Sequence, residues 1–250
     1  MNKLLITGIG ISIVLLFSCK RSTQPGPSPT VSNSQYDSVQ LTLYRFTNIY
    51  KDSMGIIDST EKEAESTADF GEKYRDLRIK SVFLNADTLF RTTTQNYYPR
   101  YYRPWWPLDE AAYHSFDACV WKIVSNNDVT DMTYTVHAVT DFDETVPYNI
   151  SRSNSLTLSF DPVKYRDVDS MLITIDGPNG PPYGVDTMIS THTGIVTFSP
   201  SQMSMIQYGT YNKGHLTVAM GRSYLYQPAS GRTYNLSVAS QVKYDINIVP

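Results

Sequence analysis

The stretch YNLSVASQVKYDINI, residues 234–248, decides the class of fold because its apolar and polar residues alternate. From Val242 to Ile248 every second residue is apolar, so in an extended strand these side chains share one face. A helix would instead space its apolar residues three and four positions apart. The pattern therefore predicts a β-strand with one face on a core and the other toward water.

The same period of two recurs along the rest of the chain. Further alternating runs begin at Val39, Met132, Leu156, Met171 and Leu216. Turn-forming residues separate the runs, at positions 85–87, 176–178, 212–214 and 230–231. Short strands with such turns predict an all-β protein built from antiparallel β-sandwiches.

Two segments carry helical signals of different kinds. Residues 199–202, SPSQ, place a capping serine before a proline and follow it with glutamine at the third helical position. They predict a short helix, with Met203 and Ile206 directed inward. Residues 60–75, TEKEAESTADFGEKYR, are highly charged with little apolar stripe, so a helix and a mobile loop both remain open.

The N-terminal residues have the pattern of a targeting segment. Lys3 precedes an uncharged run at residues 4–17, which is shorter than the roughly 20 residues of a membrane span and fits a signal-peptide core. The run ends in LFSC, residues 16–19, which resembles the lipobox of bacterial lipoproteins. The resemblance implies that residues 1–18 are a signal peptide and that the sulfur of Cys19 receives a diacylglycerol.

The lipoprotein resemblance also assigns the two cysteines and the location. If Cys19 carries lipid, Cys119 has no intramolecular disulfide partner, and its apolar run FDACVWKIV predicts a buried thiol. The polar, proline-containing segment 19–35 predicts a flexible tether that spans roughly 20–25 Å. Because Lys20 follows the cysteine, the resemblance implies a protein anchored to the cell envelope, with the outer membrane as the expected location.

The rest of the chain is expected to form two domains. A polar stretch at residues 148–154 separates two sets of strands, which predicts an N-terminal β domain at 36–151 and a C-terminal β-sandwich at 152–250. The strand order of the second domain resembles the immunoglobulin-like or fibronectin-like modules of bacterial surface lipoproteins. The first domain resembles the same lipoproteins more loosely.

The stretch NYYPRYYRPWWPL, residues 96–108, concentrates aromatic rings among prolines that rule out a continuous helix. In an extended chain neighbouring rings point to opposite sides, so each adjacent pair can bury one ring and expose the other. Three interpretations stay open: a segment that covers the core, a protein interface, and a platform for sugar rings. The candidate ligand-binding residues are Tyr97, Tyr98, Arg100, Tyr101, Tyr102, Arg103, Trp105 and Trp106.

Composition and motifs narrow the possible chemistry. A net charge of −3 without a basic cluster predicts no nucleic-acid partner. The chain has no zinc-protease, hydrolase, redox or nucleotide-binding motif, so we predict no catalytic residue, metal or cofactor. His137 is expected on the solvated face of its strand. Residues 141–144, DFDE, offer oxygens of the kind that bind Ca²⁺ but lack EF-hand spacing, which favours a polar turn.

These observations predict a non-catalytic protein with a binding or assembly role at the cell envelope. Lipidated Cys19 would hold it to the membrane, and a protein or glycan would bind the aromatic segment. The alternative is a hydrolase of envelope or extracellular polysaccharide, which would need a cleft with two carboxylates about 5–10 Å apart.

Overall fold

The computed structural model describes residues 39–70, 79–85, 87–89, 97–102, 110–125, 130–178, 184–207, 212–228 and 233–250. Nearly all regular structure in these residues is strand, in mostly antiparallel sheets, which confirms the predicted all-β class. The predicted signal peptide (1–18) and tether (19–35) lie outside the described residues, as do Arg103, Trp105 and Trp106. The finer resemblance to immunoglobulin-like modules stays a prediction.

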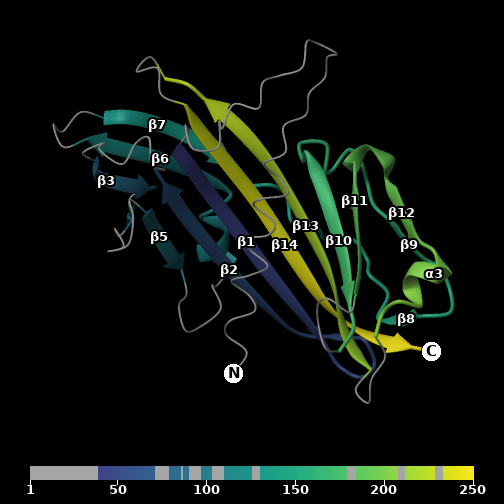
Figure 1. Ribbon diagram of the computed structural model, residues 1–250. Helices are drawn as coiled ribbons and strands as arrows, with labels where there is room; N and C mark the ends of the chain where they lie inside the picture. The colour runs from purple at the N-terminus through teal and green to yellow at the C-terminus, as the bar shows by residue number, and fades with distance from the viewer. Residues whose placement is uncertain are drawn as a thin grey trace, which may run out of the picture.

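A large mixed sheet forms the body of the protein (Figure 1). Its strands, in order across the sheet, are β11 (Gly184–Ile189), β10 (Ser170–Asp176), β13 (Lys213–Tyr226), β14 (Tyr234–Val249), β1 (Val39–Lys51), β2 (Ile57–Asp69) and β5 (Tyr97–Tyr102). Strand β8 (Asn149–Ser151) also pairs with β14. Most neighbours are antiparallel, but β1 runs parallel to β14, with Val39 opposite Tyr234. The first and last described strands are therefore neighbours inside the sheet.

The large sheet crosses the boundary that was predicted between residues 151 and 152. Strands β1, β2 and β5 come from the predicted N-terminal domain, and β10, β11, β13 and β14 come from the predicted C-terminal domain. One hydrophobic cluster also joins buried residues of both segments, from Val39 to Ile248. The boundary therefore does not separate two sheets or two cores. Local turn signals could not reveal this, because the β1–β14 pairing joins the two ends of the described chain.

Two smaller sheets contribute to the same hydrophobic core. One has the order β4 (Asp87–Thr88), β3 (Ile79–Leu84), β6 (Ala118–Ser125) and β7 (Thr130–His137), and the other pairs β12 (Ile195–Phe198) with β9 (Leu156–Ser159). Trp121 of β6 and Phe198 of β12 are almost fully buried in this cluster. In Figure 1 the four-stranded sheet and the β9–β12 pair lie on opposite sides of the long strands.

Residues 60–69 form most of strand β2, so neither a helix nor a mobile loop, the two expectations left open, is correct for them. Ala64 and Ala68 point into the core, whereas Glu63 and Glu65 are partly exposed on the other face. The strand pairs with β1 along almost its whole length. Alanine, glutamate and lysine favour helices in isolation, but this pairing and the burial of the small residues outweigh that weak preference.

The predicted helix at residues 199–202 is confirmed as α3 (Pro200–Met203). The Ser199 hydroxyl accepts a hydrogen bond from the Gln202 amide, and the Gln202 side chain accepts one from the Ser199 amide at 2.9 Å. Met203 and Ile206 are fully buried, as expected. The structure also describes α2 (Glu110–His114) and the 3-10 turn η2 (Thr191–Thr193). None of the described helices has the length and apolar content needed to cross a bilayer.

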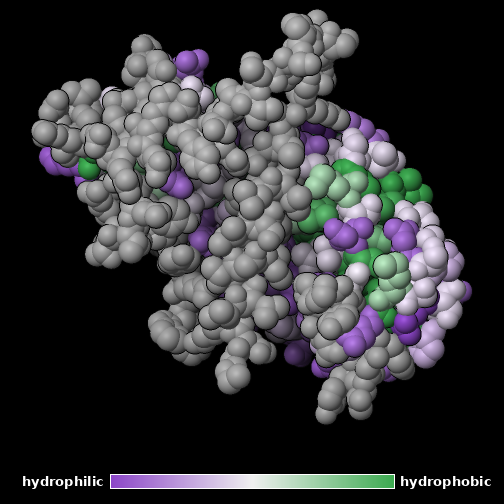
Figure 2. Space-filling view, in the orientation of Figure 1, coloured by the Kyte–Doolittle hydropathy of each residue, from purple (hydrophilic) through white to green (hydrophobic). Residues whose placement is uncertain are grey.

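The outward face of the large sheet is partly apolar. Tyr44, Ala219 and Ala239 form a second buried cluster, against which Phe46 and Leu172 pack. Figure 2 shows hydrophobic surface in the region of β10 and β11. The alternation therefore places one face of the sheet on the core, as predicted from the sequence. The opposite face carries both apolar and polar side chains and is not purely polar.

Candidate functional site

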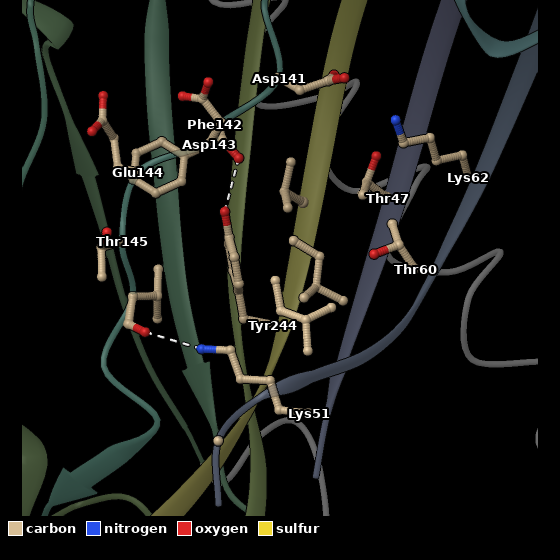
Figure 3. Close-up of a pocket in the computed structure, with 15 residues that line it drawn as sticks. Thr47, Lys51, Thr60, Lys62, Asp141, Phe142, Asp143, Glu144, Thr145 and Tyr244 are labelled. Atoms are coloured by element: carbon tan, nitrogen blue, oxygen red, sulfur yellow. Dashed lines mark hydrogen bonds between the residues drawn. The ribbon is translucent and has the colours of Figure 1, made fainter. Parts of the chain in front are cut away.

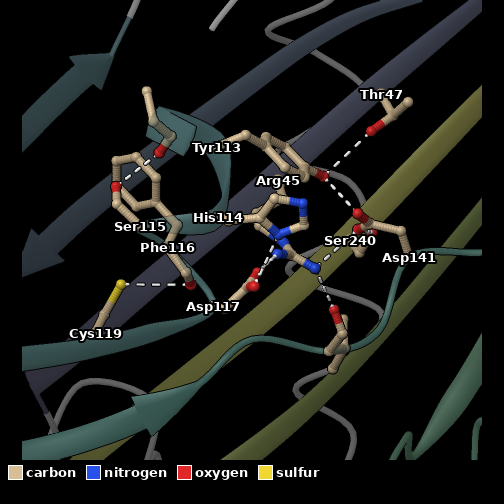
Figure 4. A network of polar contacts seen from close by, with 12 residues as sticks. Arg45, Thr47, Tyr113, His114, Ser115, Phe116, Asp117, Cys119, Asp141 and Ser240 are labelled. Carbon is tan, nitrogen blue, oxygen red and sulfur yellow. Dashed lines mark hydrogen bonds and ion pairs between the residues drawn. The ribbon is translucent and has the colours of Figure 1, made fainter. Parts of the chain in front are cut away.

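Arg45 is a buried arginine at an inward position of β1. Its side chain is only 5% exposed, so the guanidinium needs partners inside the protein. It forms ion pairs with Asp117 and, at 3.0 Å, with Asp141, and it donates a hydrogen bond to the Val139 carbonyl at 2.7 Å (Figure 4). Two carboxylates and a carbonyl thus neutralise and orient the buried cation.

Asp141 is the centre of the polar network around Arg45. The Tyr113 hydroxyl of α2 donates to one carboxylate oxygen at 2.9 Å, and the Ser240 hydroxyl of β14 donates to the other (Figure 4). The Arg45 guanidinium also lies 4.9 Å from the centre of the Tyr113 ring. Burial, reinforced by the charge of Asp141, raises the pKa of Tyr113, so this phenol stays a neutral donor. One carboxylate therefore ties β1, α2 and β14 together.

A pocket of about 480 Å³ lies beside this network (Figure 3). Strands β1 and β2 form one wall, residues 141–146 form the opposite wall, and Val242 and Tyr244 of β14 contribute between them. Asp141 belongs to both the pocket and the buried network. The volume lies within the range of about 300–1,000 Å³ that is usual for small-molecule sites.

The acidic wall of the pocket is held in place by residues that follow it in the chain. Asp143 forms an ion pair with Lys164 and accepts a hydrogen bond from the Tyr165 hydroxyl at 3.0 Å. The same hydroxyl lies 3.3 Å from Glu144. Partial burial raises the pKa of Asp143, but the hydrogen bonds from Lys164 and Tyr165 outweigh this and lower its pKa overall. The Asp143 carboxylate is therefore kept ionised.

The opposite wall carries two lysines. Lys51 donates to the Val146 carbonyl at 3.1 Å and thereby connects the two walls (Figure 3). Burial lowers the pKa of Lys51. Lys62 lies with its ammonium 4.9 Å from the centre of the Tyr113 ring. The pocket thus presents both signs of charge from separate walls, and each of these lysines is positioned by a contact within the protein.

The predicted aromatic segment is described only in part. Residues 97–102 form β5, which confirms that they are extended, and they pair with β2 so that Tyr102 is opposite Ala64. Ala64 is two positions from Lys62, a pocket residue, so β5 ends beside the part of β2 that lines the pocket. Tyr97, Tyr98, Arg100, Tyr101 and Tyr102 share this strand. Their role in ligand binding, and that of Arg103, Trp105 and Trp106, stays a prediction.

The remaining sequence candidates have structural explanations. Cys119 is fully buried, as predicted, and burial raises the pKa of its thiol to about 11, so it stays protonated at neutral pH. His137 is exposed, as expected. Residues 141–144 are a polar loop, but Asp141 and Asp143 already pair with Arg45 and Lys164. Within the residues that the structure describes, no three His, Cys, Asp or Glu side chains are grouped in a way that could hold a metal ion.

The basic residues of the site were not predicted from the sequence. Arg45 occupies an inward position in the alternation that begins at Val39, where a leucine or valine is expected, and this mismatch could have signalled a buried ionic partner. Lys51 and Lys62 carried no such signal. Lys62 lies in the segment that was expected to be a helix or a loop, so its place on a pocket wall could not be anticipated.

Comparison with known proteins adds little to this description. No protein-family model and no curated protein matches the chain. The yeast delta-COP-I mu-homology domain, a solved structure, aligns with 85% of this chain and 98% of its own, at 8% sequence identity and a TM-score of 0.23. A likeness at this level supports no conclusion about fold or function.

Proposed function

We propose that the protein is a lipid-anchored, non-catalytic binding protein of the bacterial cell envelope, and that it binds a glycan in the pocket between the β1–β2 hairpin and residues 141–146. The observation that carries the ligand-binding part is the pocket itself. Its walls are fixed in advance by the Arg45–Asp141 and Lys164–Asp143 ion pairs, so little side-chain freedom would be lost on binding.

The chemistry of the pocket suits a polyhydroxylated ligand. Carboxylates on one wall accept hydrogen bonds from sugar hydroxyls, and lysines on the other donate to sugar oxygens. Ile49 and Val146 supply apolar surface for the C–H faces of a sugar ring. Because the pocket carries both positive and negative side chains, a strongly anionic or cationic ligand would be attracted by one wall and repelled by the other, and would bind less favourably than a neutral one. The end of β5 beside this pocket supports the aromatic segment as an extension of the same site.

The state of Asp143 favours binding over hydrolysis. A glycoside hydrolase needs one carboxylic acid that stays protonated until it protonates the leaving group, which requires a raised pKa. The lowered pKa of Asp143 makes it unsuited to that role. A hydrolase remains the alternative only if a different carboxyl serves as the acid.

A protein partner is the second candidate ligand, supported by the position of β5. Within the described residues β5 pairs only with β2, so among these residues its other edge has no partner strand, and a strand from a partner could pair there. Pro99 lies in this strand, and proline is tolerated in edge strands.

The proposed anchor is tested at Cys19. We expect Cys19→Ser to abolish uptake of labelled palmitate and to release the protein from washed envelopes, because stable attachment depends on acylation of this one thiol. A serine variant that still incorporates palmitate would contradict the lipoprotein assignment and leave the pocket hypothesis untouched.

The proposed ligand is tested with a glycan array probed with the chain from residue 19 carrying Cys19→Ser, which retains every described residue. Thr60→Tyr introduces a large ring on the β2 wall of the pocket, and Thr197→Tyr makes the same change at an exposed position of β12. We expect binding to a glycan that Thr60→Tyr weakens at least about tenfold, or about 1.4 kcal/mol, and that Thr197→Tyr does not alter. Binding that is insensitive to Thr60→Tyr would contradict the pocket.

A further inference from the structure

The turn between β1 and β2 exposes three large apolar side chains. We call residues 52–57 the hairpin tip. Within it Met54 is 76% exposed, Ile56 60% and Ile57 57%. Isolated exposed apolar residues are common on protein surfaces, but three within four consecutive positions at the end of a long hairpin form a projecting apolar surface.

Hydrogen bonds within the hairpin tip pair several of its backbone amides. The Asp52 carboxylate accepts hydrogen bonds from the amides of Met54 and Ile56, both at 2.9 Å. The Asp52 amide donates to the Ile56 carbonyl at 2.9 Å, and the Gly55 amide donates to the Asp52 carbonyl at 3.0 Å. Four amides in this short turn are therefore paired without water, which lowers the cost of taking these backbone donors out of water.

The hairpin tip is also held in position by the rest of the fold. Gly55 has a φ of +82°, and a Cβ at this position would lie 2.8 Å from the Tyr148 side chain, so the turn packs closely on that residue. The Tyr148 carbonyl in turn accepts a hydrogen bond from the Asn247 amide of β14 at 2.7 Å. The tip thus lies at the same end of the molecule as the C-terminus (Figure 1).

We infer that the hairpin tip inserts into the surface of a lipid bilayer, as a second contact beside the proposed lipid at Cys19; the inference rests on that proposed anchor. A protein partner fits the tip less well, because a stable protein interface takes about 20–30 residues from each side and the tip offers three apolar side chains. Insertion into a bilayer surface does not need an interface of that size. A protein that is already anchored to the membrane also encounters the bilayer at a high effective concentration.

The length of the chain before β1 permits this contact. Strand β1 has 13 residues and spans about 43 Å, which separates the tip from Val39. The 20 residues from Cys19 to Ser38 can reach at most about 65–70 Å when extended. The tip can therefore touch the same membrane that holds the lipid. A coil of this length spans only about 25 Å on average, so the contact stretches the tether and should be reversible.

The charges around the tip indicate what kind of lipid surface it fits. Asp58 is exposed directly after the apolar residues, and Asp52 lies before them. These two acidic residues would be repelled by strongly anionic headgroups. We therefore expect the tip to prefer a zwitterionic surface, and its binding to change little with salt, in contrast to a polybasic membrane contact.

The test uses the chain from residue 19 with Cys19→Ser and an N-terminal histidine tag, tethered to phosphatidylcholine vesicles that contain a nickel-chelating lipid. A polarity-sensitive dye is attached through Met54→Cys, and Cys119 does not compete because it is buried with a pKa of about 11. We expect the dye to shift to shorter wavelength on tethering and to be quenched by nitroxide-labelled lipid. The matched control is Val163→Cys, at a site 67% exposed on another loop, where no shift is expected.

Two outcomes would overturn the inference. One is a dye at residue 54 that keeps its aqueous emission on the vesicles. The other is a shift that survives Ile56→Asp, since a charge at that position should remove the insertion. Because the histidine tag replaces the lipid, neither outcome depends on whether Cys19 is acylated, and failure here is distinct from failure of the proposed anchor.

Discussion

Replacing Asp141 by asparagine tests the central role that we assign to this carboxylate. The substitution preserves the shape of the side chain but removes the charge that faces Arg45 at 3.0 Å. Arg45 would then keep Asp117 as its ionic partner, but the Asp117 side chain is 52% exposed to solvent. The hydrogen bonds from Tyr113 and Ser240 would also lose their charged acceptor.

The expected cost follows from these lost contacts. A hydrogen bond to a charged group contributes about 1.5–3 kcal/mol, and breaking a buried ion pair costs about 3–5 kcal/mol when the remaining charge stays buried. Asp141 is itself 26% exposed, so water offsets part of the loss, and we expect about 2–4 kcal/mol. Asp117→Asn should cost less than about 1 kcal/mol, because a half-exposed carboxylate is already well hydrated.

The measurement is equilibrium unfolding in urea, followed by tryptophan fluorescence, with the free energy of unfolding extrapolated to water. Asp58→Asn is the matched control, because Asp58 is exposed and should change stability by no more than about 0.5 kcal/mol. Equal costs for Asp141→Asn and Asp117→Asn would refute the reasoning. So would a cost below about 1 kcal/mol for Asp141→Asn.

Three further predictions concern other parts of the chain. Cys119 should resist thiol reagents in the folded protein at pH 8 and react on unfolding, because its pKa is about 11; rapid reaction in the native state would contradict its burial. Burial raises the pKa of Asp143, but the hydrogen bond from Lys164 helps to lower it overall, so the stability that this pair contributes is present above the unfolded pKa and is lost as pH falls through the folded pKa. Lys164→Met should therefore make the free energy of unfolding less dependent on pH below about pH 4. An unchanged loss of stability at acid pH would count against the role of the Lys164–Asp143 pair. Of Trp105→Ala and Trp106→Ala, one should lower the free energy of unfolding by about 3–5 kcal/mol and the other hardly at all; two equal effects would show that the rings do not face opposite sides.

The sequence predicts local structure well where a local pattern is sufficient. The alternation at residues 242–248 reflects burial on one face of β14, and the SPSQ stretch at 199–202 contains all the atoms of its own capping box. Both depend on residues a few positions apart. The same kind of reasoning fails for β2, where Ala64 and Ala68 favour a helix by intrinsic preference and become strand residues only when β1 is beside them.

The candidate site depended on distant contacts and was largely invisible in the sequence. Asp141 and Asp143 were recognised as possible oxygen ligands, but their partners Arg45 and Lys164 lie far away in the chain. Nothing in the local sequence pairs these residues. An inward arginine in an otherwise apolar alternation was the one available signal, and it predicts a buried counter-charge without saying which carboxylate supplies it.

The parallel pairing of β1 with β14 also constrains when the protein can fold. Val39 is among the first described residues to be synthesised, yet its neighbour Tyr234 follows 195 positions later, since 234 − 39 = 195. The β1–β2 hairpin can form early, but the edge of β1 that pairs with β14 stays without that partner until β14 has been synthesised. Pairings of such high sequence separation form slowly. If the chain is exported unfolded, as the proposed lipid anchor implies, this delay is useful, because the large sheet cannot close before β14 has emerged.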